Sequence, residues 1–134
     1  SRDLPLIFPI HPRTRKQIQA FGLEGQAARL TMIPPQSYLD MLQLMAHATL
    51  VLTDSGGMQE ETTILNVPCL TLRQNTERPV TVEEGTSLLV GNDGEEILRQ
   101  GRALLNQGGK KARPPELWDG RAAERIVQIL RDRL

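Results

Sequence analysis

The stretch from residue 53 to residue 61, Thr-Asp-Ser-Gly-Gly-Met-Gln-Glu-Glu, constrains the fold of this chain more than any other. It follows a short apolar run, residues 48–52, and leads into a run with helical character, residues 58–66. A strand that turns into a helix at Ser-Gly-Gly gathers free backbone N–H groups at the positive end of the helix dipole, which favours phosphate. Glycine has no Cβ to keep a phosphate oxygen away from the backbone. The segment therefore predicts a site for a nucleotide diphosphate.

Short apolar runs alternate with helical patterns along the chain. We predict strands at residues 4–10, 29–33, 50–53, 68–72 and 87–90, and helices at residues 14–21, 38–48, 58–66, about 94–106 and about 120–134. The strands are apolar without alternation, as expected when helices cover both faces of a sheet. Repeated βα units predict an α/β fold with a doubly wound parallel sheet of at least five strands, and with the last helix packed across or beside the domain.

Two of the predicted helices begin with capping signals. Ser37 follows a Pro-Pro break and is itself followed, three residues on, by Asp40. Asp93 and Glu96 have the same spacing. Both pairs are typical of helix N-termini, because the first side chain can accept a hydrogen bond from an unpaired backbone N–H group.

Charge and composition exclude several classes of partner. Lys+Arg and Asp+Glu each number 16, and a general nucleic-acid or anionic-membrane binder would carry a basic excess, so we expect neither partner. No apolar stretch approaches the roughly 18 residues of a membrane span, and no signal peptide opens the chain. Aromatic residues make up 3%, so we predict an aliphatic core. Cys69, the single cysteine, indicates a reduced, cytoplasmic protein.

Three predicted loops follow strands and carry polar side chains: residues 9–15, 54–57 and 73–85. Parallel sheets bind ligands beyond the carboxyl ends of their strands, where such loops gather. His11, in the first loop, could carry a proton or donate to a phosphate, since imidazole titrates near neutral pH; alternatively it caps the loop. For His47, within an apolar helix, we expect a partly buried structural role.

Side chains around the second and third loops suggest further contacts. Glu60 and Glu61 point about 100° apart on a helix, so only one can face a ligand, and it could serve a ribose hydroxyl. Ser55 lacks the Gly-x-Ser-x-Gly setting of a hydrolase nucleophile. Arg78 could clamp a phosphate or a sugar with its planar fork; the alternative is a solvated charge pair. We expect residues 83–84 to begin a short helical turn.

Several motifs occur together in the order found in one family. They are His-Pro-Arg-Thr at residues 11–14, Leu-Thr-Asp-Ser-Gly-Gly-Met-Gln-Glu-Glu at 52–61, Val-Pro-Cys-Leu at 67–70, Thr-Glu-Arg-Pro at 76–79, Glu-Gly-Thr at 84–86, Leu-Val-Gly at 89–91 and Trp-Asp-Gly-Arg-Ala-Ala-Glu-Arg-Ile at 118–126. Through them, essentially the whole chain strongly resembles the UDP-N-acetylglucosamine 2-epimerases.

The resemblance implies a Rossmann-like half of a two-domain, glycosyltransferase-B-like fold, with residues 1–134 as the C-terminal nucleotide-binding domain. Since the chain starts at Ser1 and enters a strand within three residues, we expect a fragment without the N-terminal catalytic half. By resemblance, the site residues are Ser55, Gly56 and Gly57 for the diphosphate, Glu61 for the ribose, Arg78 for the phosphate or sugar, Gln36 and Met41 for the uracil and ribose pocket, and His11 as the active-site histidine beside the diphosphate leaving group.

The family's reaction eliminates UDP across C1–C2 of the sugar and adds it back after a proton returns on the other face. It implies a UDP-sugar substrate and no redox cofactor, and the chain shows no metal-ligand spacing. The acids that move the proton at C2 belong to the N-terminal half in this family. We therefore expect this chain alone to bind UDP at most, within a whole protein that is a homodimer.

Two other interpretations remain open. The donor-binding half of a glycosyltransferase shares the fold, the glycine-rich helix start and a ribose-binding glutamate. A nucleotide-sensing module would share the binding site, but it would have no use for a histidine held between prolines at the mouth of the site. Related enzymes hydrolyse the substrate instead of adding UDP back, so the outcome of the reaction is also open.

Overall fold

The computed structural model describes residues 4–110 and 112–134. The chain divides into two compact units between Met41 and Leu42, within a helix. Unit 1 contains β1 (Ile7–Pro9), α1 (Pro12–Ala20), α2 (Glu24–Ala27), β2 (Thr31–Ile33) and the start of α3 (Tyr38–Ala46). β1 and β2 pair in parallel, with Phe8 opposite Met32. Unit 1 is therefore a small βαβ unit.

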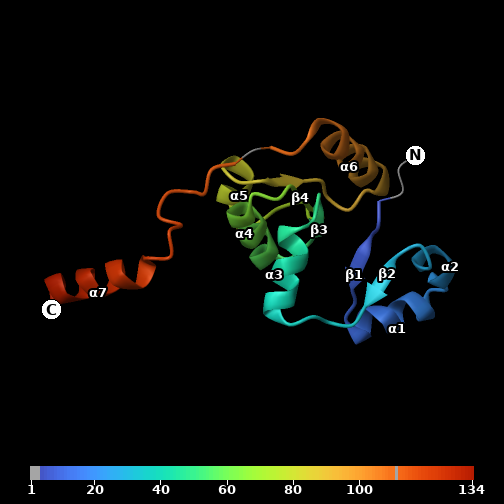
Figure 1. The fold of residues 1–134 in the computed structure, drawn as a ribbon, viewed down its shortest axis with the longest axis horizontal. Helices are drawn as coiled ribbons and strands as arrows, with labels where there is room; N and C mark the ends of the chain where they lie inside the picture. Colours follow the sequence, from blue (N-terminus) through green and yellow to red (C-terminus); the bar gives the residue numbers. More distant parts are fainter. Residues whose placement is uncertain (1–3, 111) are drawn as a thin grey trace. The chain divides into compact units, whose positions relative to one another are not determined.

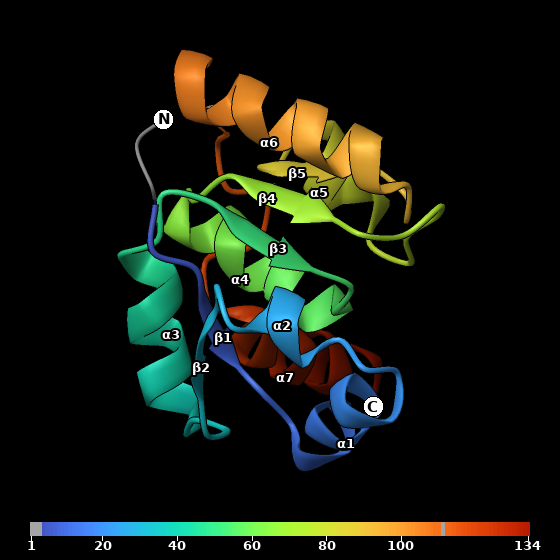
Figure 2. The same ribbon diagram turned by 90° about the vertical axis from the view of Figure 1, so that its right-hand side faces the viewer.

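Unit 2 contains a parallel sheet between two helices. Its elements are β3 (Val51–Thr53), α4 (Gly56–Leu65), β4 (Cys69–Thr71), α5 (Pro79–Glu83), β5 (Ser87–Leu89), α6 (Gly94–Gln107) and α7 (Ala122–Arg133). The strand order is β3-β4-β5; β3 and β4 are labelled in Figure 1, and all three strands in Figure 2. Leu70 packs against Gly101 of α6, and the alternation of the strand turns Cys69 and Thr71 towards α4. Helices α4 and α6 thus lie on opposite faces of the sheet (Figure 2).

The core on the α4 side is rich in hydroxyl groups, so the predicted aliphatic core is only partly correct. Thr62, Thr63, Thr71 and Thr81 are all at most 1% exposed. Thr62 Oγ1 donates to Met58 O at 2.8 Å, and Thr63 Oγ1 donates to Gln59 O at 2.9 Å. Such bonds offset the cost of burying a hydroxyl, so threonine can replace valine in a core without leaving a polar group unpaired.

The glycine at position 85 is required by this packing. A Cβ on Gly85 would collide with Thr63 Oγ1 and with the carbonyl oxygen of Thr81. The chain between α5 and β5 therefore passes against α4 more closely than any side chain allows.

The capping predictions hold in both helices. Ser37 Oγ donates to Asp40 Oδ2 at 2.6 Å and accepts from Asp40 N at 3.3 Å. Asp93 Oδ1 accepts from Glu96 N at 2.9 Å. The Glu96 carboxylate does not return to the cap: it pairs with Arg99 at 2.6 Å, and this contact lowers the pKa of Glu96 to about 2.

The α/β class and the parallel pairing are confirmed, and each of the two units contains a parallel sheet. The five strands form a two-stranded sheet, β1-β2, and a three-stranded sheet, β3-β4-β5. Each strand is only three residues long. An apolar pattern identifies a strand but not its neighbour.

Three further expectations need correction. Residues 83–84 end α5 instead of starting a helical turn, because Pro79 occupies its first turn. Helix α2 was not expected from its sequence pattern. The last helix was expected to pack on the domain, yet no residue of α7 is buried, and Ile126, Val127, Ile129 and Leu130 are each about half exposed. Across residues 4–110 and 112–134, no helix is long and apolar enough to cross a bilayer.

Candidate functional site

The turn between β3 and α4 leaves two backbone donors open. Ser55 is the N-cap residue of α4, and its Oγ accepts from Met58 N at 3.5 Å. Its own N–H was expected to be free, but it donates to Thr53 Oγ1 at 3.0 Å. The N–H groups of Gly56 and Gly57 have no acceptor within the described part of the chain. They lie at the positive end of the α4 dipole, which makes the turn an anion site.

Nothing in the fold itself calls for glycine at positions 56 and 57. Neither residue has a positive φ. A Cβ on Gly56 would lie 3.8 Å from Arg78 Cγ, and one on Gly57 would lie 3.9 Å from Ser55 Oγ, which are ordinary contacts. Glycine in a helix costs up to about 1 kcal/mol relative to alanine. A ligand that approaches the backbone closely would explain both glycines.

Arg78 brings a positive charge to this turn. Its Cγ and the Glu77 carboxylate flank the position that a Cβ of Gly56 would take. Arg78 Nε lies 2.7 Å from Glu60 Oε1, yet this buried nitrogen makes no aligned hydrogen bond to any residue that the structure describes. The contact is therefore an ion pair between Arg78 and Glu60.

The two adjacent glutamates have different surroundings. Glu60 is paired with Arg78. Glu61 is half-buried and makes no side-chain hydrogen bond or ion pair among residues 4–110 and 112–134. Of the two carboxylates, Glu61 is thus the one open to a further hydroxyl donor.

The predicted site residues fall into both units. Ser55, Gly56, Gly57, Glu61 and Arg78 belong to unit 2, where Ser55, Gly56 and Arg78 lie together. His11, Gln36 and Met41 belong to unit 1.

His11 and its neighbours in unit 1 have local roles in the structure. His11 is the N-cap residue of α1, and its Nδ1 accepts from Arg13 N at 3.2 Å. An accepting Nδ1 places the proton of the neutral ring on Nε2, which can then donate to a ligand. Gln36 Nε2 donates to Pro34 O at 2.6 Å. Met41 is half-buried in α3.

Two other expectations concern histidine and metals. His47 is exposed, not partly buried; it directly follows α3 and bonds through Nδ1 to Gln43 O of that helix at 2.8 Å. The His47 ring therefore has a hydrogen-bond partner within the neighbouring helical turn. In the described part of the chain, no three His, Cys, Asp or Glu side chains lie close enough to hold a metal ion.

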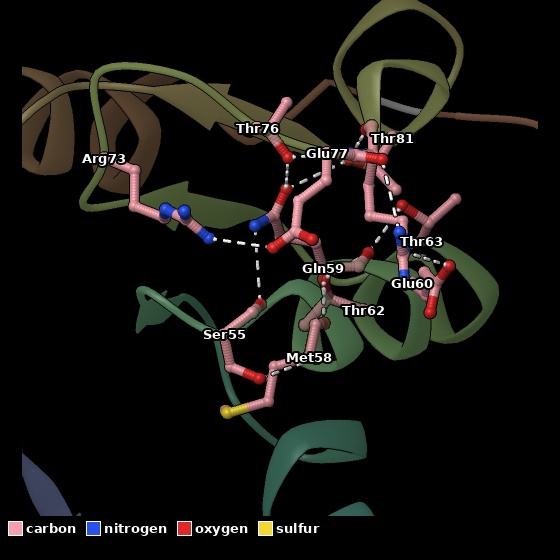
Figure 3. A network of polar contacts seen from close by, with 11 residues as sticks. Ser55, Met58, Gln59, Glu60, Thr62, Thr63, Arg73, Thr76, Glu77 and Thr81 are labelled. Carbon is pink, nitrogen blue, oxygen red and sulfur yellow. Dashed lines mark hydrogen bonds and ion pairs between the residues drawn. The ribbon is translucent and has the colours of Figure 1, made fainter.

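The sequence did not reveal the role of Gln59. This side chain is 0% exposed and lies at the centre of a polar network with Ser55, Thr76 and Thr81 (Figure 3). The available signal was its place on α4: Gln59 is one turn beyond Ser55, on the face that also carries Thr62 and Thr63. A polar residue on a buried helical face usually has a hydrogen-bonding task.

Comparison with known proteins identifies close relatives. A family profile described as UDP-N-acetylglucosamine 2-epimerase matches residues 1–131. The UDP-N-acetylglucosamine 2-epimerase of Methanocaldococcus jannaschii is 45% identical over 131 residues, covering 96% of this chain and 35% of that protein. The enzyme of the same name from Escherichia coli K12 is 38% identical over 138 residues, covering 98% and 36%. The chain thus spans about a third of the length of these curated relatives.

Solved structures are similar to the chain over the same extent. The M. jannaschii UDP-GlcNAc 2-epimerase in complex with UDP-GlcNAc and UDP has a TM-score of 0.79 at 44% identity and covers 97% of this chain and 36% of its own. The S. aureus MnaA-UDP co-structure has a TM-score of 0.81 at 33% identity, covering 98% and 36%.

Proposed function

The chain belongs to the UDP-N-acetylglucosamine 2-epimerase family, and on that premise we propose that it is the UDP-binding part of such an enzyme. The whole protein would interconvert UDP-N-acetylglucosamine and UDP-N-acetylmannosamine by eliminating UDP and adding it back. The main support for UDP binding is the pair of N–H groups at Gly56 and Gly57, which have no acceptor among the described residues and lie beside Arg78. Together they provide donors and positive charge for a diphosphate.

We assign the remaining contacts from the geometry and from family membership. Ser55, Gly56 and Gly57 hold the diphosphate, and Arg78 contacts the phosphate or sugar. Glu61, which has no partner in the described structure, accepts from the ribose hydroxyls. Gln36 and Met41 line the uracil and ribose pocket. His11 lies beside the leaving diphosphate. His11 Nε2 would donate to a phosphate oxygen, since Nδ1 already accepts from Arg13.

The test is calorimetric titration of the chain with UDP and with ADP. Ser55→Ala removes the cap hydroxyl, and Glu61→Ala removes the carboxylate. Each change should weaken UDP binding by about 1.5–3 kcal/mol, the usual contribution of a hydrogen bond to a charged group. The wild-type chain should bind UDP more tightly than ADP.

A matched control comes from α6. Glu95 is an exposed glutamate in the first turn of that helix, so Glu95→Ala should leave UDP affinity unchanged. Thermal unfolding of Ser55→Ala separates lost binding from lost capping, which costs about 1 kcal/mol. Unchanged affinity in both site variants would place the nucleotide elsewhere.

We also propose that the whole protein is a cytoplasmic homodimer. Cys69 is a free, buried thiol, which suits a reducing compartment. Cell fractionation and light scattering of the whole protein test the two statements separately.

A further inference from the structure

Gln59 connects the glycine turn to the segment before α5. Its Nε2 donates to Ser55 O at 3.4 Å. Its Oε1 accepts from Thr76 Oγ1 at 2.8 Å and lies 3.3 Å from Thr81 Oγ1. Figure 3 shows the side chain between Ser55 and the two threonines. The carbonyl of Ser55 cannot donate, so it sets the orientation of the amide and turns Oε1 towards the hydroxyls.

The same two threonines hold both backbone groups of Arg78. Arg78 N donates to Thr76 Oγ1 at 3.0 Å, and Thr81 Oγ1 donates to Arg78 O at 2.7 Å. Thr81 has a single hydroxyl proton, and the shorter contact, to Arg78 O, takes it. The continuous relay therefore runs from Arg78 N through Thr76 Oγ1 to Gln59 Oε1, and from Gln59 Nε2 to Ser55 O.

Arg78 is the N-cap residue of α5, with a φ of −125° and a ψ of 59°. Helix α5 holds its carbonyl, which accepts from Thr81 N at 3.0 Å. Its N–H group, in contrast, is held by Thr76 and so by the relay through Gln59. Gln59 is fully buried, so water cannot replace its bonds, and breaking one would leave a buried polar atom unpaired.

We propose that Gln59 is a positioning residue for the diphosphate site. It holds the backbone of Arg78 at a set place relative to the open N–H groups of Gly56 and Gly57, so that cation and donors meet a diphosphate together. The inference rests on the proposed function, in which Arg78 contacts the phosphate or sugar. Gln59 itself touches no ligand; it acts through Thr76.

The test breaks the relay at Thr76 and asks whether the effect passes through Arg78. Thr76→Val keeps the shape but removes the hydroxyl, and Thr76→Ser keeps the hydroxyl as the matched control. In calorimetry with UDP, Thr76→Val should weaken binding about five- to tenfold, the effect of one such hydrogen bond. Thr76→Ser should stay within about twofold of the wild-type chain.

A double-mutant cycle separates positioning from a general loss of stability. In an Arg78→Ala background, Thr76→Val should cause no further loss of UDP affinity, because the residue it positions is gone. Full additivity of the two losses would overturn the inference. If Arg78→Ala alone leaves UDP binding unchanged, the error lies in the proposed function, in the role given to Arg78.

Hydrogen exchange of the Arg78 amide tests the relay in the wild-type chain, so this test does not depend on whether a variant folds. The Arg78 amide lies outside any helix or strand, but the relay predicts that it is protected from hydrogen exchange. Its protection should fall in Gln59→Met while the amides of β4 stay protected. Exchange of the wild-type Arg78 amide at the rate of an exposed loop would refute the relay.

Discussion

Gly56 and Gly57 form a first helical turn in which alanine would be more stable than glycine. Neither has a positive φ, and a Cβ would make ordinary contacts. The glycines therefore reduce the stability of the helix and keep the backbone N–H groups accessible. At the scale of the residue, the stability of α4 and the binding of a diphosphate therefore place opposite demands on these two positions. A single glycine-to-alanine substitution can separate the two effects.

Gly57→Ala should raise the stability of the chain by up to about 1 kcal/mol, yet weaken UDP binding about tenfold or more, the equivalent of a lost hydrogen bond to a charged group. Thermal unfolding and calorimetry measure the two effects. Gly94→Ala is the matched control: this glycine also begins a helix, α6, and has nothing within 4 Å of an added Cβ. It should stabilise the chain without changing UDP affinity. Wild-type UDP affinity in Gly57→Ala would refute close approach of the diphosphate.

At the scale of the element, β4 is the most enclosed strand of unit 2. Cys69, Leu70 and Thr71 are each 0% exposed, because α4 covers one face and α6 the other. Burial raises the pKa of the Cys69 thiol above its ordinary value of 9.0, against the opposing effect of hydrogen bonds with Thr62 and Thr71. The thiol is therefore protonated and inaccessible in the native chain.

Thiol labelling of the native chain should be very slow at pH 8, and should become fast in denaturant. The unfolded thiol ionises near pH 9.0, whereas the buried one stays neutral. The contribution of the thiol to stability is thus fully present below pH 9 and is lost as the pH rises towards the native pKa. Unfolding measured from pH 8 to pH 10 should show this decline in the wild-type chain and not in Cys69→Ala. Rapid labelling of Cys69 in the native chain at pH 8 would mean that β4 is accessible to solvent.

At the scale of the whole molecule, the chain represents about a third of its curated relatives. Elimination across C1–C2 needs a base within hydrogen-bond reach of the C2 proton. Glu60 and Glu77, the carboxylates beside Arg78, are each engaged in an ion pair with an arginine. If the chain provides only one side of the binding site, the bound sugar stays in contact with water, which a closed active site would exclude.

The 134-residue chain should therefore bind UDP but not turn over UDP-N-acetylglucosamine. NMR of the incubated substrate should show neither the manno epimer nor free UDP above the uncatalysed background. The whole protein, assayed alongside, should show the epimer. Turnover by the chain alone would place the acid–base groups within these residues and contradict the proposed division of labour.

The geometry of the candidate site was predictable where it depends on local sequence. The open N–H groups at Gly56 and Gly57 follow from a few adjacent residues, because helix-end and dipole effects act within one helical turn. The cap formed by Ser55 was not among the predicted caps. The Gln59 relay was not predictable in this way. It joins α4 to a segment 17 residues further along the chain, and such a contact exists only after the sheet has brought the two segments together.

The sequence by itself determined the α/β class, the parallel βα order, the caps at Ser37 and Asp93, and the family, since each depends on neighbouring residues or on the order of motifs. Only the tertiary structure decided which strands pair, that a buried core could be built from threonines, and that Glu60 rather than Glu61 faces Arg78. Strand pairing and side-chain partners depend on contacts between distant residues, and the free energy of those contacts is shared by many positions. No single stretch of the chain encodes them.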